Sequence, residues 1–119
     1  MHDAANQPSP WVSLTLLVPA ALRARVVDWL LAREDAQLEF SVHGVAAHGP
    51  LVRLSVDEEQ VQGFADRVEV KLIVERPRLS ALIEGIEALL AGAEGGYWVR
   101  PLERFAAFPP KTAQRDQER

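Results

Sequence analysis

The chain has 119 residues, of which 48% are hydrophobic and 25% are charged, and its formal net charge is -4. This length and balance predict one globular domain rather than two domains or a disordered chain. The negative charge, without a stripe of Lys and Arg, argues against nucleic acid as a partner. The absence of cysteine excludes disulfides, thiolate metal sites and a cysteine nucleophile, and fits a protein of the cytoplasm.

The two ends of the chain are polar and contain proline. Residues 1–10 and 109–119 carry too few apolar side chains to offset the entropy of ordering, so we expect disordered tails around one domain at 11–108. No signal peptide is expected in the first ten residues. The longest apolar run, 11–22, is interrupted by polar residues and is short of the roughly 20 that a membrane helix needs, so no membrane insertion is expected.

The first half of the domain changes its apolar period twice. Alternation in 12–18 predicts a half-buried strand. From Pro19 to about Arg33 the apolar side chains recur at helical spacing, with proline in the first turn. Alternation returns in 38–45 and predicts a second strand, which is followed by a weakly patterned excursion at 46–66. Within that excursion, a possible capping box indicates one short helical turn; its residues are Ser55 and Glu58.

The second half repeats the same order of periods. Strict alternation in 68–75 predicts a third strand. A wide apolar stripe after Pro77 predicts a second helix, with Gly92 at its C-cap. The last apolar segment, 97–105, contains Pro101, which lacks a backbone donor, so this fourth strand is predicted at an edge of the sheet.

The β-α-β-β-α-β order predicts an α+β fold of the ferredoxin-like type, a sandwich of one four-stranded antiparallel sheet with both helices on one face. The opposite, open face would carry a mixture of polar and large apolar side chains, which suits either solvent or an interface. These residues are Ser13, Thr15, Leu17, Glu39, Ser41, His43, Glu69, Lys71, Ile73, Trp98 and Arg100.

Three segments carry a resemblance to a known family. They are FSVHGVAAHG in the second strand, LSVDEEQVQGFADR leading into VEVKL, and the closing YWVRPLERF. In these segments the chain, over about residues 11–108, resembles the PII-like signalling proteins, in particular a proteobacterial PII-like family of unknown function often encoded beside heavy-metal efflux pumps of the resistance-nodulation-division type.

The resemblance implies a homotrimer whose open sheet faces line the centre. It also implies that residues 46–66 form the loop called the T-loop in PII proteins, and that small effectors bind in clefts between subunits beside the base of that loop. An effector would then reshape the loop, which contacts a partner such as a membrane transporter or a regulatory protein.

Two departures from the PII pattern limit what the resemblance implies. PII proteins carry a Gly-Asp-Gly-Lys phosphate loop before the fourth strand and an Arg-Thr-Gly stretch after it, whereas this chain has AGAEGGYW and FAAFPPK. ATP binding in the PII manner is therefore not expected. Uridylylation is not expected either, because the single tyrosine, Tyr97, begins the fourth strand.

Two histidines bracket the start of the excursion and are candidate metal ligands. His43 and His48, with Glu39 on the strand face of His43, offer imidazole and carboxylate groups of the kind that bind zinc, copper or nickel. One chain supplies no evident set of three or four ligands, so a trimer would have to complete the site by symmetry. The alternative is that both histidines form local hydrogen bonds only.

A second set of candidates suits an anionic effector. Arg53 and Arg67 flank the excursion and could hold an anion by forked hydrogen bonds, or pair with carboxylates at 57–59. Glycine residues could let the backbone approach a ligand or form an anion nest, or could serve only in tight turns. These glycines are Gly44, Gly49, Gly95 and Gly96.

No catalytic triad, paired-acid arrangement or nucleotide-hydrolase phosphate loop stands out, so no enzymatic activity is expected. Three functions remain open. The first is a PII-like regulator that senses a small effector and signals through 46–66, with an efflux system as one possible partner. The second is a metal-binding accessory protein of a cation efflux system, and the third is a structural oligomer that docks through its sheet face.

Overall fold

The computed structural model describes residues 9–33, 38–51 and 65–111. Within them, one antiparallel sheet contains four strands in the order β2-β3-β1-β4. The strands are β1 (Trp11–Pro19), β2 (Glu39–Ala47), β3 (Ala65–Glu75) and β4 (Gly96–Pro101). A short 3-10 turn, η2 (Ala20–Leu22), leads into helix α1 (Arg23–Leu31), and helix α3 (Arg76–Leu89) joins β3 to β4.

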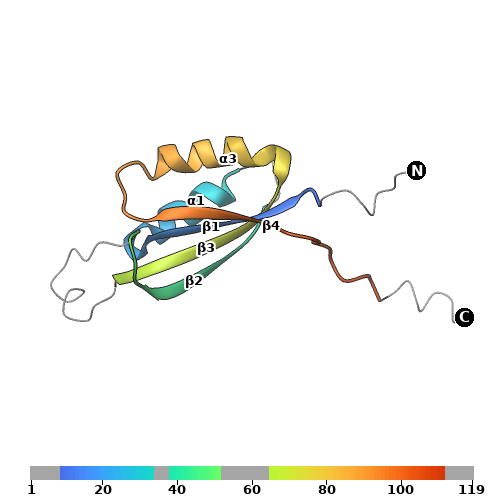
Figure 1. Ribbon diagram of the computed structural model, residues 1–119, viewed down its shortest axis with the longest axis horizontal. Coiled ribbons are helices and arrows are strands. Elements are labelled where there is room, and N and C mark those ends of the chain that lie inside the picture. The colour runs from blue at the N-terminus through green and yellow to red at the C-terminus, as the bar shows by residue number, and fades with distance from the viewer. Residues whose placement is uncertain (1–8, 34–37, 52–64, 112–119) are drawn as a thin grey trace, which may run out of the picture.

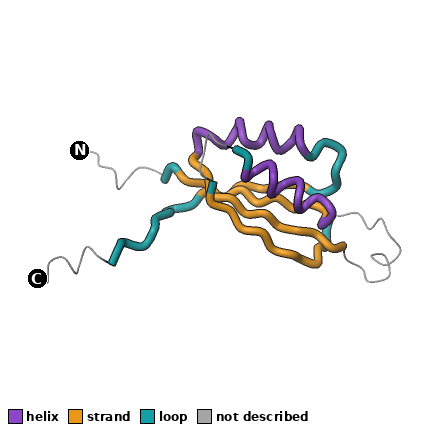
Figure 2. Tube along the Cα trace, turned by 180° about the vertical axis from the view of Figure 1, so that it is seen from behind, coloured by secondary structure: helices purple, strands orange, loops and turns teal. Residues whose placement is uncertain are grey.

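Both helices cover one face of the sheet, as Figure 1 shows, and the view from behind in Figure 2 shows the same two layers. The predicted fold class and the predicted edge position of the fourth strand are therefore confirmed. The second edge is β2, which pairs only with β3 among the described strands. Neither described helix is long and apolar enough to cross a membrane.

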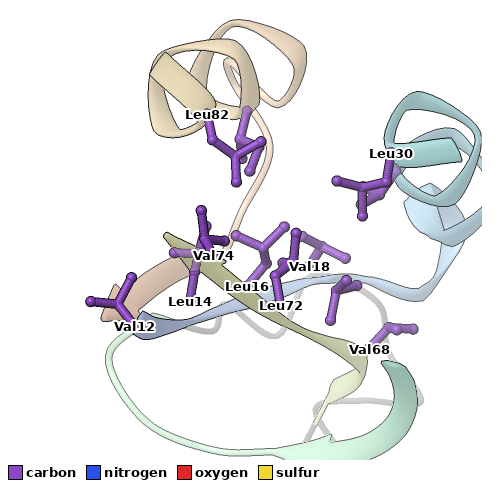
Figure 3. Packing of buried hydrophobic residues seen from close by; sticks show 12 residues of the cluster. Val12, Leu14, Leu16, Val18, Leu30, Val68, Leu72, Val74 and Leu82 are labelled. Atoms are coloured by element: carbon purple, nitrogen blue, oxygen red, sulfur yellow. The ribbon is translucent and has the colours of Figure 1, made fainter. Parts of the chain in front are cut away.

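The core lies between the two central strands and the helices. Every second residue of β1 and β3 points to the helix layer and is almost fully buried, and the helices add four apolar side chains from above (Figure 3). This alternation follows the predicted one, because each strand must bury one face and expose the other. The core residues are Val12, Leu14, Leu16, Val18, Val26, Leu30, Val68, Val70, Leu72, Val74, Leu82 and Ile86.

Several element ends differ from the predictions. The first helix starts at Arg23 rather than Pro19, because the chain first makes the tighter turn η2 as it leaves the strand. Helix α3 ends at Leu89 with Leu90 as its cap, so the predicted cap Gly92 lies in the following turn, with φ of 85°. Pro77 lies in the first turn of α3, where the backbone angle fixed by its ring suits a helix.

The strands also extend into the segment predicted as an excursion. β2 continues to Ala47 and β3 begins at Ala65, and these two residues form the last pair of the β2–β3 ladder. The predicted helical turn with Ser55 and Glu58 lies outside the described residues. The hairpin-like pairing of β2 and β3 therefore brings both ends of this segment to one end of the sheet.

Candidate functional site

The strand register arranges the open face in cross-strand rows. One row contains Glu39, Ile73, Ser13 and Arg100, the next Ser41, Lys71, Thr15 and Trp98, and the third His43, Glu69, Leu17 and Gly96. Neighbours within a row are close enough for their side chains to interact. The rows decide which of the predicted ligands meet.

The three predicted metal ligands do not come together in one copy. Glu39 and His43 lie two rows apart on β2, and this corresponds to about 13 Å along a strand. His43 lies opposite Glu69, and its Nε2 is 3.2 Å from the hydroxyl of Ser41. His48 lines a cavity that also contains Glu69. Among the described residues, no three His, Asp or Glu side chains gather into a group that could hold a metal ion.

The cavity beside His48 lies over the open face and measures about 390 Å³. The short segment after β2 lines it together with Leu17, Glu69 and Trp98. Leu51 in this segment packs on Gly96, where an added Cβ would lie 3.0 Å from the leucine side chain. Residues 48–51 therefore reach the β4 side of the open face, and Leu17 below is only 7% exposed.

The predicted anion-binding residues separate into two places. Gly44 is exposed in β2 with open space around it, and Gly49 follows β2 with φ of 115°. Arg53 lies outside the described residues. Arg67, Gly95 and Gly96, by contrast, come together at the end of the sheet where β1 ends and β4 begins.

Arg67 is a buried cation, and its side chain is only 4% exposed. Its Nη2 donates to Oε1 of Glu94 at 3.0 Å, and its Nη1 donates to the carbonyl oxygen of Asp66 at 2.9 Å. The predicted alternative of a pair with carboxylates at 57–59 falls outside the described residues. The sequence analysis did not identify Glu94 as a site residue. Its position directly before the Gly95-Gly96 pair is the signal that could have identified it.

Gly95 allows two strands to meet closely. It has φ of 120°, a conformation that favours glycine, and a Cβ at this position would fall on the carbonyl oxygen of Leu17. The backbone of β1 therefore excludes any side chain here. Glycine is therefore required at position 95 for a steric reason, whether or not its backbone also binds an anion.

A cleft of about 150 Å³ opens between the end of α3 and the start of β4. Its apolar walls include Leu16, Ile86 and Leu90, and its charged lining residues, all within the described part of the chain, are Glu87 and Glu94. With only carboxylates at its rim, this cleft attracts cations and needs positive groups from elsewhere to hold an anion.

Tyr97 forms part of the same cleft. Its hydroxyl donates to Oε2 of Glu87 at 2.7 Å. This hydrogen bond raises the pKa of Tyr97 above its ordinary value of 10.0, because it holds the neutral phenol, and partial desolvation and the charge of Glu87 act in the same direction. Tyr97 and Glu87 therefore link β4 to α3 at the mouth of the cleft.

Solved structures with the same fold include a DUF3240 family protein from Shewanella baltica OS155, which is 15% identical and has a TM-score of 0.68 over 85% of this chain and 99% of that one. PII of Arabidopsis thaliana bound to citrate is 14% identical, with a TM-score of 0.54 over 80% of this chain and 79% of that one. A GlnK–ATP complex of B. subtilis is 11% identical, with a TM-score of 0.51 over 78% of this chain and 82% of that one.

These identities are low enough that the three structures establish the fold and no more. No curated protein sequence matches the chain. The family model of DUF3240, described as a protein of unknown function, matches residues 8–108. The chain therefore belongs to the DUF3240 family, whose fold is that of the PII proteins.

Proposed function

We propose that this protein is a PII-like regulator, a cytoplasmic homotrimer rather than an enzyme, that binds a small effector in clefts between its copies. Occupancy of the cleft changes the segment 46–66, which then contacts a partner protein. The support is the PII fold together with the position of the cleft beside the base of this segment.

The observation that carries the proposal is the ion pair between Arg67 and Glu94. Arg67 is the third residue of β3 and stands directly at the end of the segment 46–66. Glu94 lines the cleft. An anionic ligand that takes the place of the Glu94 carboxylate on the guanidinium would break this pair, so the pair offers a physical route from the cleft to the base of the segment.

The composition of the cleft bears on the kind of effector. The related PII and GlnK structures hold citrate and ATP, which are both anionic. The described lining of this cleft has carboxylates as its only charged groups, so an anion would require cations from a second copy. This requirement favours a site between copies over a site within one copy.

The partner is proposed to be a membrane transporter of the heavy-metal efflux type. The support for this partner is the resemblance of the three sequence segments to the family encoded beside such pumps.

A thermal-shift screen tests the sensing role. The purified chain is heated with nucleotides, bicarbonate, 2-oxoglutarate and the ions of copper, zinc, nickel and cobalt, and its mass in solution is measured alongside. A specific nucleotide or metabolite that raises the melting temperature of a trimer supports the proposal, because a ligand of the native state stabilises it by mass action. A monomer without any such ligand would contradict it.

The coupling step has its own test in hydrogen exchange. Glu84, an exposed residue of α3, provides the control variant Glu84→Gln. The ligand found by the screen should change hydrogen exchange in residues 46–66 in both the natural chain and this control. The same ligand should leave exchange in 46–66 unchanged in Glu94→Gln, because the charge that holds Arg67 is gone. An equal response in both variants would refute the route through this ion pair.

A metal-binding accessory role is the second candidate, and one observation favours it. His43 lies opposite Glu69, and His48 lines a cavity with the same glutamate, so two imidazoles and a carboxylate occur on one part of the open face. A complete site would use ligands of another copy. Retention of zinc, copper or nickel by the natural chain, and its loss on His43→Ala with His48→Ala, would support this role. Unchanged retention would eliminate it.

A further inference from the structure

The chain leaves the domain after β4 as an extended arm, residues 102–111. The backbone N–H of Leu102 donates to the carbonyl oxygen of Trp11 at 3.1 Å, and the ring of Phe105 packs edge-on against the ring of Trp11, with centroids 4.9 Å apart. These two contacts fix the start of the arm at the end of the sheet where β1 begins. Figure 1 shows the arm continuing away from the sheet beyond this point.

Beyond Phe105 the arm exposes a continuous apolar run. Residues 106–110 read AAFPP and are all exposed, and the side chain of Phe108 is 96% exposed. A single exposed apolar residue needs no explanation, but a run of five exposed apolar residues is typical of a segment that binds a surface. The next residue, Lys111, is the only charged one among described residues 106–111.

The cleft between α3 and β4 has the complementary properties. It combines apolar walls with the carboxylates Glu87 and Glu94 at its rim, and an apolar segment followed by a lysine matches both features. We propose that the arm of one copy binds the cleft of a second copy, with Phe108 between the apolar walls and Lys111 facing the two carboxylates.

The arm cannot fill the cleft of its own copy. The cleft lies near Leu17 and the arm is held at Trp11, six residues away along β1, which corresponds to about 20 Å. Phe108 lies three positions after Phe105 along the chain, and three fully extended residues span at most about 11 Å. Figure 1 shows the arm and the α3–β4 turn at opposite ends of the sheet. A second copy is therefore the occupant that geometry allows.

Such a contact is head-to-tail, because different surfaces of the two copies meet. Head-to-tail contacts close into rings when the rotation between copies permits. The inference rests on the proposed assembly into a trimer and adds to it the group that each copy supplies to the next. In this arrangement an effector entering the cleft would compete with Phe108 for the apolar walls.

The lack of cysteine in the natural chain makes disulfide trapping a clean test. The variant with Ala93→Cys, in the cleft lining, and Phe108→Cys should form disulfides between copies under mild oxidation, since a disulfide needs Cβ atoms about 4 Å apart. Its matched control combines Ala88→Cys with Phe108→Cys. Ala88 is also exposed, on the last turn of α3, but does not line the cleft.

Mixing isotope-labelled and unlabelled chains separates the outcomes. Disulfides between labelled and unlabelled copies in the Ala93 variant, at several times the yield of the Ala88 control, support the arm exchange. Disulfides within one copy, or equal yields in both variants, overturn it. A photoreactive benzoylphenylalanine in place of Phe108 serves as a second measurement, since it leaves the cleft unchanged and should cross-link to residues of the cleft in another copy.

Charge reversal tests the role of the lysine. Lys111→Glu in the photoreactive chain should lower the cross-linking yield by roughly threefold, as expected for a partly exposed ion pair. Adding Glu87→Lys to the Lys111→Glu chain should restore the cross-linking yield. If the yield stays low, Lys111 does not pair with Glu87 in the cleft. If cross-links form while no ligand appears in the thermal-shift screen, the sensing role fails and the arm exchange stands. If a trimer binds a ligand but forms no such cross-links, the arm exchange fails and the sensing role stands.

Discussion

Three glycines form a graded series that tests the close approach at the start of β4. Gly44 has no unusual backbone angle and open space where a Cβ would lie. Gly49 has the same open space but φ of 115°. Gly95 combines φ of 120° with a Cβ position that falls on the carbonyl oxygen of Leu17. Replacing each by alanine therefore separates backbone strain from steric exclusion.

The expected free energies of unfolding follow from these differences. Gly44→Ala should leave stability unchanged or raise it by up to about 1 kcal/mol, because alanine restricts the unfolded chain. Gly49→Ala should lower it by about 1–3 kcal/mol through backbone strain alone. Gly95→Ala should have a backbone strain similar to that of Gly49→Ala, and a steric conflict of about 1–3 kcal/mol in addition. It should therefore lower the free energy of unfolding by about 2–6 kcal/mol.

Urea unfolding of the three variants and the natural chain, at one protein concentration, measures these values. The slope of the unfolding free energy against urea concentration should be the same for the natural chain and the three variants. Equal slopes would show that all four proteins expose a similar surface on unfolding. A Gly95→Ala variant as stable as Gly49→Ala would refute the close approach of β4 to β1. It would also leave the glycine at 95 open to a purely ligand-binding explanation.

Two further predictions concern the cleft. Glu94→Gln should lower the free energy of unfolding by about 1.5–3 kcal/mol, because it removes the charged partner of the buried Arg67. The control Glu84→Gln should change this free energy by less than about 0.5 kcal/mol. Equal effects of the two variants in urea unfolding would contradict the ion pair. Glu87→Gln should lower the pKa of Tyr97 towards 10.0, measured by phenolate absorbance of the single tyrosine. Because folding raises this pKa, the stability from the hydrogen bond is present below pH 10.0 and is lost as pH rises through the raised value; an unchanged titration would contradict the bond.

Much of the fold could be predicted because burial imposes a period on the sequence. The alternation in 12–18 and 68–75 identified the strand residues that point to the helices, and the helical stripe after Pro77 identified a helix. Element ends were less predictable, as η2 and the cap of α3 show, because a turn depends on where the next element must pack. The edge position of β4 followed from Pro101, whose missing donor is a local property.

The candidate site was predictable only as a set of residue types. The sequence indicated Arg67, Gly95 and Gly96 as members of one larger set of anion-binding candidates. It did not indicate that these three meet beside Glu94, because Arg67 and Glu94 are 27 positions apart. In the same way, the sequence placed Glu39 beside His43 on one strand face, but the register placed Glu69 opposite His43. Strand register and the contacts of a turn depend on long-range packing, which a local pattern does not encode.

The sequence by itself determined which face of each strand and helix is buried, since that choice depends on the spacing of apolar residues along the chain. Only the tertiary structure decided that a buried arginine joins the start of β3 to the cleft, and that Gly95 must lack a side chain. It also placed the start of the arm beside Trp11 and the cleft beside Leu17, near opposite ends of β1. These features arise where segments distant in sequence meet, and the geometry of that meeting is set by the packed sheet and helices together.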